Sequence, residues 1–388
     1  MKKNKIKILA ITGIRSEYDL MQPVFYELSK KKNIKFSLFV TGAHLSKKHG
    51  YTVREIIKDK FNIFGKSKSL FNSNSLVSRI KGISIQIKNL MKSIILYKPD
   101  LLIVAGDREE SITVALVGSY MNIPIAHVSG GDRVVGNIDD QIRHAVTKLS
   151  HIHFTTNIES KQRILKMGEQ PFRVFNVGNP GIDRLKIEKR ISSKKISKLI
   201  NFEIDYNENY IILIQHPLSS EYKDSYRQMK ITLDAIKELK IKTIVISPNS
   251  DAGNQDILKA IKECKNLKFI CTVKNLSRDI FVNLLRNSSC LIGNSSAGIL
   301  EAPALKLPVV NIGNRQKKRL HSSNVQFVNH DINQIKKAIK KAIYDKSYIY
   351  RVSKCKSLYG DGRTGQRIAN ILSKLKFNKK LLIKDITY

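Results

Sequence analysis

Short apolar runs alternate with longer amphipathic stretches along most of the chain. In the stretch 16–31, for example, Leu20, Val24 and Leu28 recur every four residues, which is typical of a helix with one buried face. The intervening apolar runs have the length of buried strands. Strands separated by helices predict a parallel, doubly wound sheet with helices on both faces.

This alternation occurs twice. In the first half we expect strands at 5–12, 35–41, 101–105, 123–128, 152–155 and 173–177, helices at 16–31, 78–97, 111–121 and 139–150, and a loop near 65–75. In the second half we expect strands at 210–215, 243–247, 267–271, 290–293 and 309–312, and helices at 226–239, 255–263, 279–286 and 297–305. The stretch 186–200 between them, rich in lysine and serine, is interpreted as a linker or connecting helix.

The length of 388 residues exceeds one ordinary hydrophobic core, so we expect two α/β domains. Their expected bounds are 1–185 and 186–355, and 356–388 is expected to be a helical segment that packs back on the first domain. The basic and then apolar start of the chain is interpreted as a first strand rather than a signal peptide, because Lys7 interrupts it.

The formal net charge of +37 changes the picture only in part. The lysines are spread along the chain and no basic arm or nucleic-acid motif gathers them. We therefore expect an anionic small substrate and no specific nucleic acid. No apolar run reaches the roughly 18 residues that span a bilayer. The four cysteines have no CxxC spacing, which indicates neither a disulfide framework nor zinc and favours a cytoplasmic location.

No G-x-G-x-x-G motif follows the first expected strand, as it would in a dehydrogenase, and the G-x-x-x-x-G-K-[ST] motif of P-loop enzymes does not occur in the sequence. Polar clusters instead follow several expected strands. After the first strand, Arg15 either points towards anionic groups or pairs with Glu17 at the surface. After the strand 101–105, Asp107 either caps the next helix or takes part in chemistry.

The segment 127–144 is dense in ionisable residues. Asp132, Asp139, Asp140 and Arg143 are candidates for acid–base or binding roles, since convergent charges shift one another's pKa. One of the adjacent aspartates has a second interpretation, because Asn137 resembles an N-cap with Asp140 in a capping box. Metal binding is the alternative interpretation for the histidines of this segment and for His151 and His153. We expect His151 and His153 to be buried and hydrogen-bonded instead.

Two clusters belong to the second domain. Asn294, Ser295 and Ser296 precede an expected helix, whose free amides would suit a diphosphate, with Glu301 further along the same helix to accept from ribose hydroxyls. Simple helix capping is the alternative. His216 ends the first strand of this domain and is a candidate for a catalytic role.

Together these clusters resemble the UDP-N-acetylglucosamine 2-epimerase family, in particular its hydrolysing branch. The resemblance spans nearly the whole chain, and it is the joint order of the motifs that is specific. The matching motifs are Thr12-Gly13-Ile14-Arg15-Ser16-Glu17-Tyr18, Thr41-Gly42-Ala43-His44-Leu45, Gly50-Tyr51-Thr52, Gly106-Asp107-Arg108, Gly130-Gly131-Asp132, Gly136-Asn137-Ile138-Asp139-Asp140, Arg143-His144-Ala145, Gly178-Asn179-Pro180, Gly293-Asn294-Ser295-Ser296 and Asn311-Ile312-Gly313-Asn314-Arg315-Gln316.

The resemblance implies a GT-B-like fold, with two Rossmann-like domains facing a central cleft and the nucleotide held mainly by the second. It implies that Asp107, the segment 127–140 and His216 surround the sugar. It also implies that the nucleotide is held by Arg15, Ser295, Ser296, Glu301 and Arg315. No metal or redox cofactor is implied. The expected partners are a nucleotide sugar and further copies of the chain, as a dimer or tetramer.

One position departs from the family pattern. The sialic-acid branch has His-x-Glu-Gly-Gly-Glu, and here the two glutamates are replaced by Ser129 and Asp132. Either Asp132 takes over the proton transfer or another carboxylate does. The departure also suggests a different sugar, such as a UDP- or GDP-linked diacetamido-trideoxyhexose on the way to legionaminic acid.

The reaction expected from the resemblance removes the nucleotide and inverts carbon 2 through a glycal. Asp107, Asp132 and Asp139 or Asp140 are the acid–base candidates, and the sequence does not order them. The rival functions are a non-hydrolysing epimerase, a more distant GT-B glycosyltransferase, and an inactive nucleotide-binding regulatory protein, which Ser129 makes conceivable.

Overall fold

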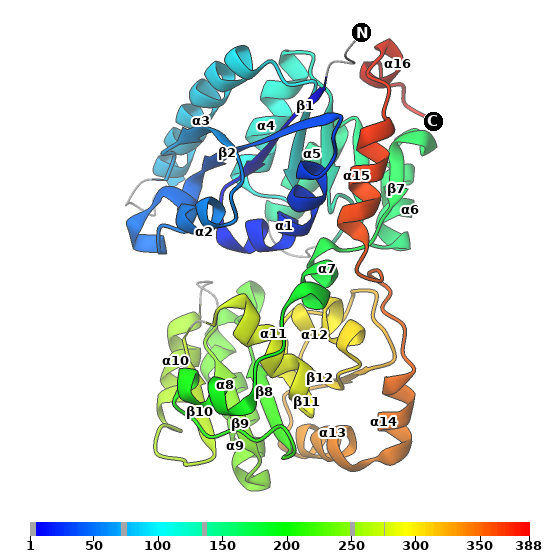
Figure 1. The fold of residues 1–388 in the computed structure, drawn as a ribbon. Helices are drawn as coiled ribbons and strands as arrows, with labels where there is room; N and C mark the ends of the chain where they lie inside the picture. Colours follow the sequence, from blue (N-terminus) through cyan, green and yellow to red (C-terminus); the bar gives the residue numbers. More distant parts are fainter. Residues whose placement is uncertain (1–4, 71–75, 134–137, 249–252, 275) are drawn as a thin grey trace. The chain divides into compact units, whose positions relative to one another are not determined.

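The computed structural model describes residues 5–70, 76–133, 138–248, 253–274 and 276–388. The chain forms two compact units (Figure 1). The first unit contains Met1–Arg184 together with Tyr359–Tyr388, and the second contains Leu185–Leu358. The last part of the chain therefore returns to the first unit.

The first unit is built on a seven-stranded parallel sheet of order β3-β2-β1-β4-β5-β6-β7. Its strands are β1 (Ile6–Thr12), β2 (Ile34–Thr41), β3 (Ile63–Ser67), β4 (Leu101–Ala105), β5 (Ile125–Val128), β6 (Ile152–Thr155) and β7 (Val174–Asn176). Its helices are α1 (Arg15–Ser29), α2 (Val53–Lys58), α3 (Leu76–Tyr97), α4 (Glu109–Tyr120), α5 (Ile138–Leu149), α6 (Ile158–Lys166), α15 (Thr364–Lys374) and α16 (Lys379–Leu382). Helix α7 (Pro180–Ile187) contains the boundary between the units.

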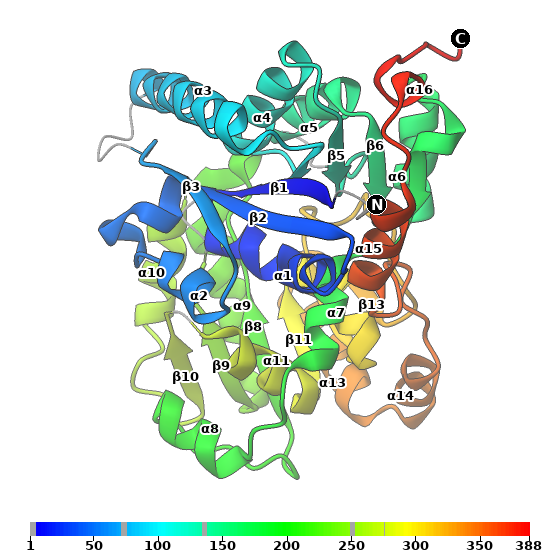
Figure 2. The same ribbon diagram turned by 45° about the horizontal axis from the view of Figure 1, so that its top comes forward.

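Apolar side chains cover both faces of this sheet. Helices α3, α4 and α5 pack on one face, where Leu90, Val114 and Val146 are fully buried. Helices α1 and α15 pack on the other, through Val24 and Ile368 (Figure 2). Burial on both sides explains why strands such as β4 are continuously apolar rather than alternating.

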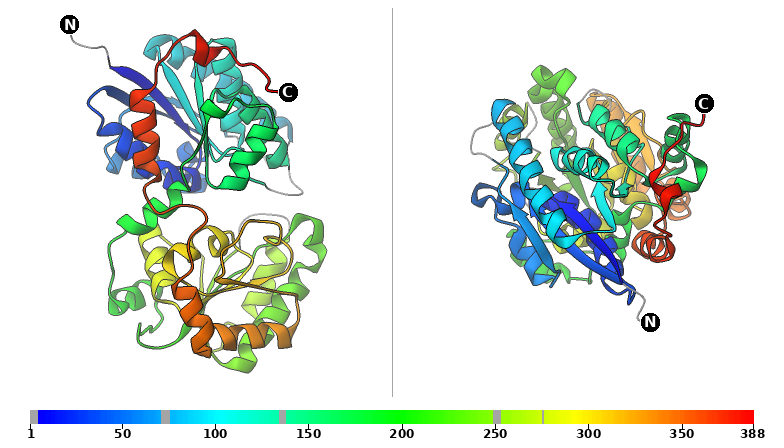
Figure 3. Two further views of the ribbon diagram at one scale, coloured as in Figure 1. Left: turned by 90° about the vertical axis from the view of Figure 1, so that its right-hand side faces the viewer. Right: turned by 90° about the horizontal axis from the view of Figure 1, so that it is seen from above.

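Helix α15 belongs to the segment expected to pack back on the first domain. It lies beside α1 (Figure 3), and the approach is close enough that a Cβ on Gly365 would lie 2.7 Å from the carbonyl oxygen of Pro23. Asp183 accepts hydrogen bonds from the amides of Thr364 (3.0 Å) and Gly365 (2.7 Å), which fixes the start of α15.

The second unit has a six-stranded parallel sheet of order β10-β9-β8-β11-β12-β13. Its strands are β8 (Tyr210–Ile214), β9 (Lys242–Ile246), β10 (Ile270–Val273), β11 (Cys290–Gly293), β12 (Val309–Ile312) and β13 (Val325–Val328). Its helices are α8 (Ser193–Ile200), α9 (Ser225–Leu239), α10 (Asn254–Lys262), α11 (Arg278–Asn287), α12 (Ala297–Leu300), α13 (Ile332–Tyr344) and α14 (Lys346–Ser353). Separate buried clusters on its two faces make this unit doubly wound as well.

Three element predictions were wrong, and one of them is the strand expected at 267–271, which is observed at Ile270–Val273. The expected loop near 65–75 overlaps β3 at 65–67, since the mixed polar pattern of this edge strand is not typical of a buried strand, and 71–75 lie outside the described residues. The expected helix 297–305 is broken into α12 and a 3₁₀ turn, Ala302–Leu305. Pro303 explains the break, since proline lacks an N–H and disfavours helical backbone in the residue before it.

Within the described residues, no helix combines the length and apolarity needed to cross a lipid bilayer.

Candidate functional site

In each unit the candidate residues gather where the strand order reverses. The first sheet reverses between β1 and β4, and the second between β8 and β11. Ligands of open α/β sheets bind outside the carboxyl ends of strands at such points. Asp107 follows β4, while His216 and Asn294 follow β8 and β11.

Asp107 forms a mostly buried ion pair with Arg143 of helix α5. The side chain of Asp107 is 18% exposed and that of Arg143 is 10% exposed. Helix α4 begins at Glu109 with Arg108 as its N-cap and without a capping side chain. The helix-cap interpretation of Asp107 is therefore wrong. The turn that presents Asp107 needs a glycine before it, because Gly106 has φ +69°.

His127 supports this turn from below. It is fully buried on β5, and its Nε2–H donates to the carbonyl oxygen of Gly106 at 2.8 Å. Its Nδ1 lies 3.2 Å from the hydroxyl of Thr147 on α5. Burial lowers the pKa of His127 to about 3, so the ring is neutral at physiological pH. The sequence showed a histidine here without indicating this supporting contact.

Asp139 and Asp140 occupy the first turn of α5. Asp140 lies 3.7 Å from the Nε2 of His144, one turn further along. Burial first, and then the negative charge of Asp107, raise the pKa of Asp139. A carboxyl group with a raised pKa in this place suits proton transfer. The proposed N-cap, Asn137, lies outside the described residues.

Asp132 is held by hydroxyl groups. The hydroxyl of Thr156 donates to its Oδ1 at 2.7 Å, and the hydroxyl of Ser160 donates to the same oxygen. These contacts join the loop after β5 to the start of α6. Ser129, in the same loop, is buried and has φ +64°. The structure gives Asp132 a clear organising role, and its acid–base role stays a prediction.

Arg15 lies 3.3 Å from Glu55 and 3.7 Å from Asp19, and these are its described ion pairs rather than one with Glu17. Glu17 is partly buried instead, and desolvation together with the charge of Glu110 raises its pKa well above the usual range.

The carboxylate of Glu110 packs tightly at the end of β1. A Cβ on Gly13 would lie 2.2 Å from its Oε1, and a Cβ on Gly42 would lie 2.5 Å from the same atom. The two glycines therefore make room for this carboxylate. Local sequence patterns do not indicate the arrangement of Glu17 and Glu110, because it depends on contacts between separate strand ends.

In the second unit, Asn294 brings three candidates together. Its amide accepts from the backbone N–H of His216 at 2.7 Å and donates to the carbonyl oxygen of the same residue at 2.8 Å. Arg315 in turn donates to the carbonyl oxygen of Asn294 at 3.2 Å. Gly293 has φ +113°, and a Cβ there would lie 2.1 Å from the carbonyl oxygen of Ile214. Only glycine allows the ends of β8 and β11 to approach so closely.

The residues after Asn294 depart from the expected helix start. Helix α12 has four residues, so its macrodipole is too small to carry the anion-site argument by itself. Ser296 is the N-cap residue but its side chain makes no capping bond. Glu301 ends α12 instead of lying further along it, and it accepts from Arg278 at 2.8 Å. No sequence motif marks Arg278 as a partner of Glu301.

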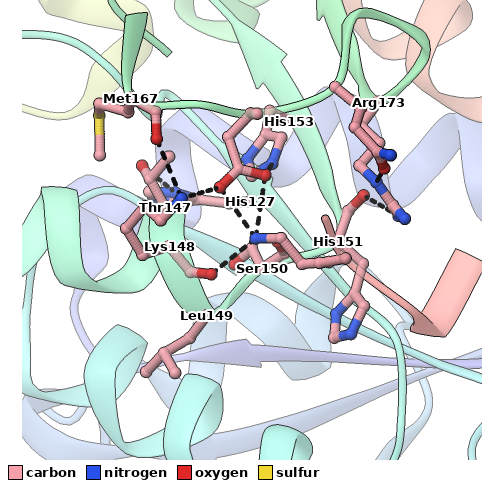
Figure 4. Close-up of polar contacts among 12 residues, drawn as sticks. His127, Thr147, Lys148, Leu149, Ser150, His151, His153, Met167 and Arg173 are labelled. Atoms are coloured by element: carbon pink, nitrogen blue, oxygen red, sulfur yellow. Dashed lines mark hydrogen bonds and ion pairs between the residues drawn. The ribbon is translucent and has the colours of Figure 1, made fainter. Parts of the chain in front are cut away.

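His151 and His153 are buried and hydrogen-bonded, as expected (Figure 4). The Nδ1 of His151 accepts from the amide of Ile125 at 3.2 Å, and Nε2 of His153 donates to Glu169 at 3.1 Å. Across the described part of the chain, no group of three or more histidine, cysteine, aspartate or glutamate side chains is arranged to hold a metal ion.

Comparison with known proteins places these features in a family. The family model for UDP-N-acetylglucosamine 2-epimerase matches residues 26–373. The UDP-N,N'-diacetylbacillosamine 2-epimerase (hydrolyzing) of Legionella pneumophila is 34% identical, over 98% of this chain and 99% of that protein. The GDP/UDP-N,N'-diacetylbacillosamine 2-epimerase (hydrolyzing) of Campylobacter jejuni is 33% identical, over 87% of this chain and 88% of its own.

Solved structures show the same fold. The UDP-GlcNAc 2-epimerase of Neisseria meningitidis bound to UDP-GlcNAc superposes with a TM-score of 0.81 at 20% identity, covering 95% of this chain and 100% of that one. A UDP-N-acetylglucosamine 2-epimerase from Listeria monocytogenes gives 0.76, also at 20% identity, over 95% of this chain and 96% of its own. The expected two-domain, GT-B-like α/β fold is confirmed, and the chain belongs to the UDP-N-acetylglucosamine 2-epimerase family.

Proposed function

We propose that this protein is a hydrolysing 2-epimerase. It converts a nucleotide-activated N-acetylamino hexose to a free manno-configured sugar and a nucleoside diphosphate. The observation that carries the proposal is the meeting of Asp107, Asp139 and Arg143 at the switch point of the first sheet. Such a site combines an oriented carboxylate, a carboxyl group with a raised pKa and a cation.

The proposed substrate is UDP- or GDP-N,N'-diacetylbacillosamine, and the product would feed the synthesis of legionaminic acid. The names of the relatives from Legionella pneumophila and Campylobacter jejuni support this choice. UDP-GlcNAc is the second candidate substrate, with a sialic acid as the end product. It is supported by the 32% identity to the polysialic acid biosynthesis protein P7 of Escherichia coli.

The chemistry begins at carbon 2. We assign Asp107 as the base that removes the carbon-2 proton, because its ion pair with Arg143 orients it. The electron pair forms the glycal double bond as the bond from carbon 1 to the nucleoside diphosphate breaks. Water then adds at carbon 1, and a proton returns to the opposite face of carbon 2. We assign this proton to Asp139, whose raised pKa favours the protonated form.

Arg143 can donate a further hydrogen bond to the substrate. Its Nε is buried and has no hydrogen-bond partner among the described residues. An unpaired buried donor is costly unless a ligand completes it. We infer that the substrate accepts this hydrogen bond, and that the cation stabilises charge that develops as the diphosphate leaves.

The nucleotide part of the proposal rests on the second unit. Ser295, Ser296 and Arg315 would hold the diphosphate, and Glu301 the ribose. His216 would contact the sugar. The mutual hydrogen bonds of His216, Asn294 and Arg315 support a preformed site. A homo-oligomer, either dimer or tetramer, and a cytoplasmic location are inferred from the family resemblance.

Isotope labelling tests the reaction. Purified protein is incubated with UDP-GlcNAc and with UDP- and GDP-N,N'-diacetylbacillosamine, and the products are followed by NMR and mass spectrometry. In deuterium oxide we expect a free manno-configured sugar with deuterium at carbon 2, because the returning proton comes from a group that exchanges with solvent. In heavy-oxygen water we expect the label on carbon 1 and not in the nucleoside diphosphate.

Other products would contradict the proposal in distinct ways. Hydrogen retained at carbon 2 would rule out the elimination route. A sugar that still carries its nucleotide would identify a non-hydrolysing epimerase. Nucleotide binding without turnover of any of the three substrates would identify a binding protein.

A further inference from the structure

The end of the chain is fastened to the first unit by buried polar contacts. We call the segment Lys379–Tyr388 the C-terminal strap. Arg173, which is fully buried, donates to the carbonyl oxygens of Lys380 (2.9 Å), Leu381 (2.6 Å) and Ile383 in this strap. The strap is therefore held by its backbone, at a fixed place beside β7.

Lys384 of the strap reaches the end of helix α5. Its Nζ donates to the carbonyl oxygens of Lys148 and Ser150, at 2.6 Å each. The last carbonyls of a helix have no partner within the helix, and they carry the negative end of its dipole. A lysine is a suitable cap for them. Figure 4 shows Lys148 and Ser150 converging on this point.

The same ammonium group meets a buried carboxylate. Lys384 lies 2.9 Å from Glu169, whose side chain is 1% exposed. Glu169 also pairs with Lys148 at 3.0 Å and accepts from His153 at 3.1 Å. A buried carboxylate without paired cations is costly in free energy. Removing one of the cations that pair with Glu169 should therefore destabilise the cluster of Glu169, Lys148 and His153.

Two routes lead from Lys384 to the proposed catalytic groups. The first is helix α5 itself, which has Lys384 at its carboxyl end and carries Arg143 and Asp139 nearer its start. The second passes through Glu169 to His153, which is the register partner of His127 on the neighbouring strand. His127 donates to Gly106, directly before Asp107.

We propose that Lys384 is a positioning residue for the reaction: by capping α5 and pairing with Glu169, it holds Arg143 and Asp139 in register with Asp107. This inference rests on the proposed function. Lys384 touches no substrate. It sets the distance between groups that do, and a misplacement of about 1 Å in such groups costs up to about a hundredfold in rate.

The test compares three full-length variants with the parent. Lys384→Met removes the cation but keeps the length of the side chain. Lys384→Arg keeps a cation. Lys379→Met is the matched control, because Lys379 is an exposed lysine of the same strap. Each variant is assayed for kcat and KM, for nucleoside diphosphate affinity by calorimetry, and for amide hydrogen exchange in the segments 105–112 and 138–149.

We expect Lys384→Met to lower kcat by about tenfold to a hundredfold, with KM within about threefold of the parent and diphosphate affinity unchanged. Exchange should rise in both segments. Lys384→Arg should keep most of the rate, and Lys379→Met should match the parent in every measurement. Unchanged diphosphate affinity shows that the second unit of each variant is folded.

A strap that only stabilises the fold would behave differently. The proposal is overturned if Lys384→Met keeps the parent kcat per folded molecule, whatever its melting temperature, or if Lys384→Arg loses as much as Lys384→Met. If the parent turns over none of the substrates, the proposed function fails. The positioning role is then judged by hydrogen exchange, and unchanged exchange in both segments overturns it.

Discussion

Asp107 gains its chemical character from its neighbours. Gly106 gives the turn its left-handed backbone, His127 holds the carbonyl oxygen of Gly106 from below, and Arg143 pairs with the carboxylate. None of these contacts uses Asp107 to stabilise helix α4, which begins without it. A neutral replacement should therefore affect the reaction far more than the fold.

Asp107→Asn should lower kcat by about a hundredfold to ten-thousandfold, the usual range for loss of a general base. The thermal midpoint and the affinity for the nucleoside diphosphate should stay close to those of the parent. Kinetics, scanning calorimetry and titration calorimetry measure these three quantities. The control is Asp205→Asn, at an exposed loop carboxylate of the second unit, which should leave all three unchanged. A near-normal rate in Asp107→Asn would remove Asp107 from the mechanism.

Helix α12 was expected at this place, but it is shorter than expected and contributes less to anion binding. Its four residues provide little dipole, so the polar side chains before it must supply more of any anion binding. The hydroxyl of Ser295 accepts from the amide of Ala297 at 3.3 Å and supports the turn. The hydroxyl of Ser296 caps nothing and is the better candidate for a phosphate contact.

Ser296→Ala should weaken nucleoside diphosphate binding by about 0.5–2 kcal/mol, as expected for one lost hydrogen bond to a charged group. Stability should change little, because the side chain is not part of the helix cap. Titration calorimetry with UDP and GDP measures the affinity. Ser353→Ala, at an exposed position of α14 in the same unit, serves as the control. If the variant binds with the affinity of the parent, Ser296 has no part in the nucleotide site.

Buried histidines with a lowered pKa are concentrated in the first unit, whereas in the second unit burial lowers the pKa of His330. In the first unit, burial lowers the pKa of His44 and His151 to about 4 and that of His127 to about 3. Each depressed pKa lies below the unfolded value of 6.5, so the unfolded chain binds more protons between the two values. Stability from these groups is complete above pH 6.5 and falls as the pH drops towards 4. Glu17 opposes this trend, since its raised pKa favours proton binding by the folded state.

Between pH 7 and pH 5 we expect the first unit to lose several kcal/mol of stability, at roughly 2 kcal/mol for each of these three histidines. The thermal midpoint should fall over this interval. Limited proteolysis at pH 5 should cleave within the first unit before the second, and mass spectrometry locates the cuts. A midpoint that stays constant from pH 7 to pH 5, or earlier cleavage of the second unit, would contradict the expectation.

The alternation of strands and helices was readable from the sequence, because hydrophobic periodicity is local and buried strands such as β4 are continuously apolar. The order of the polar motifs was enough for the family. The edge strand β3 was not readable, since an edge strand is only partly buried and its pattern is mixed. The end of helix α12 at Glu301 is indicated in the sequence by Pro303, because proline breaks a helix.

The tertiary structure alone decided which polar groups meet. Asp107 pairs with Arg143, Asp132 accepts from hydroxyls just before and within α6, and Lys384 reaches α5 from the far end of the chain. Parallel sheets bring strand ends together from distant parts of the sequence, and local periodicity carries no information about which ends become neighbours. The residue types of the site were therefore determined by the sequence itself. Their partners, and with them the distinction between chemistry and support, were decided only by the fold.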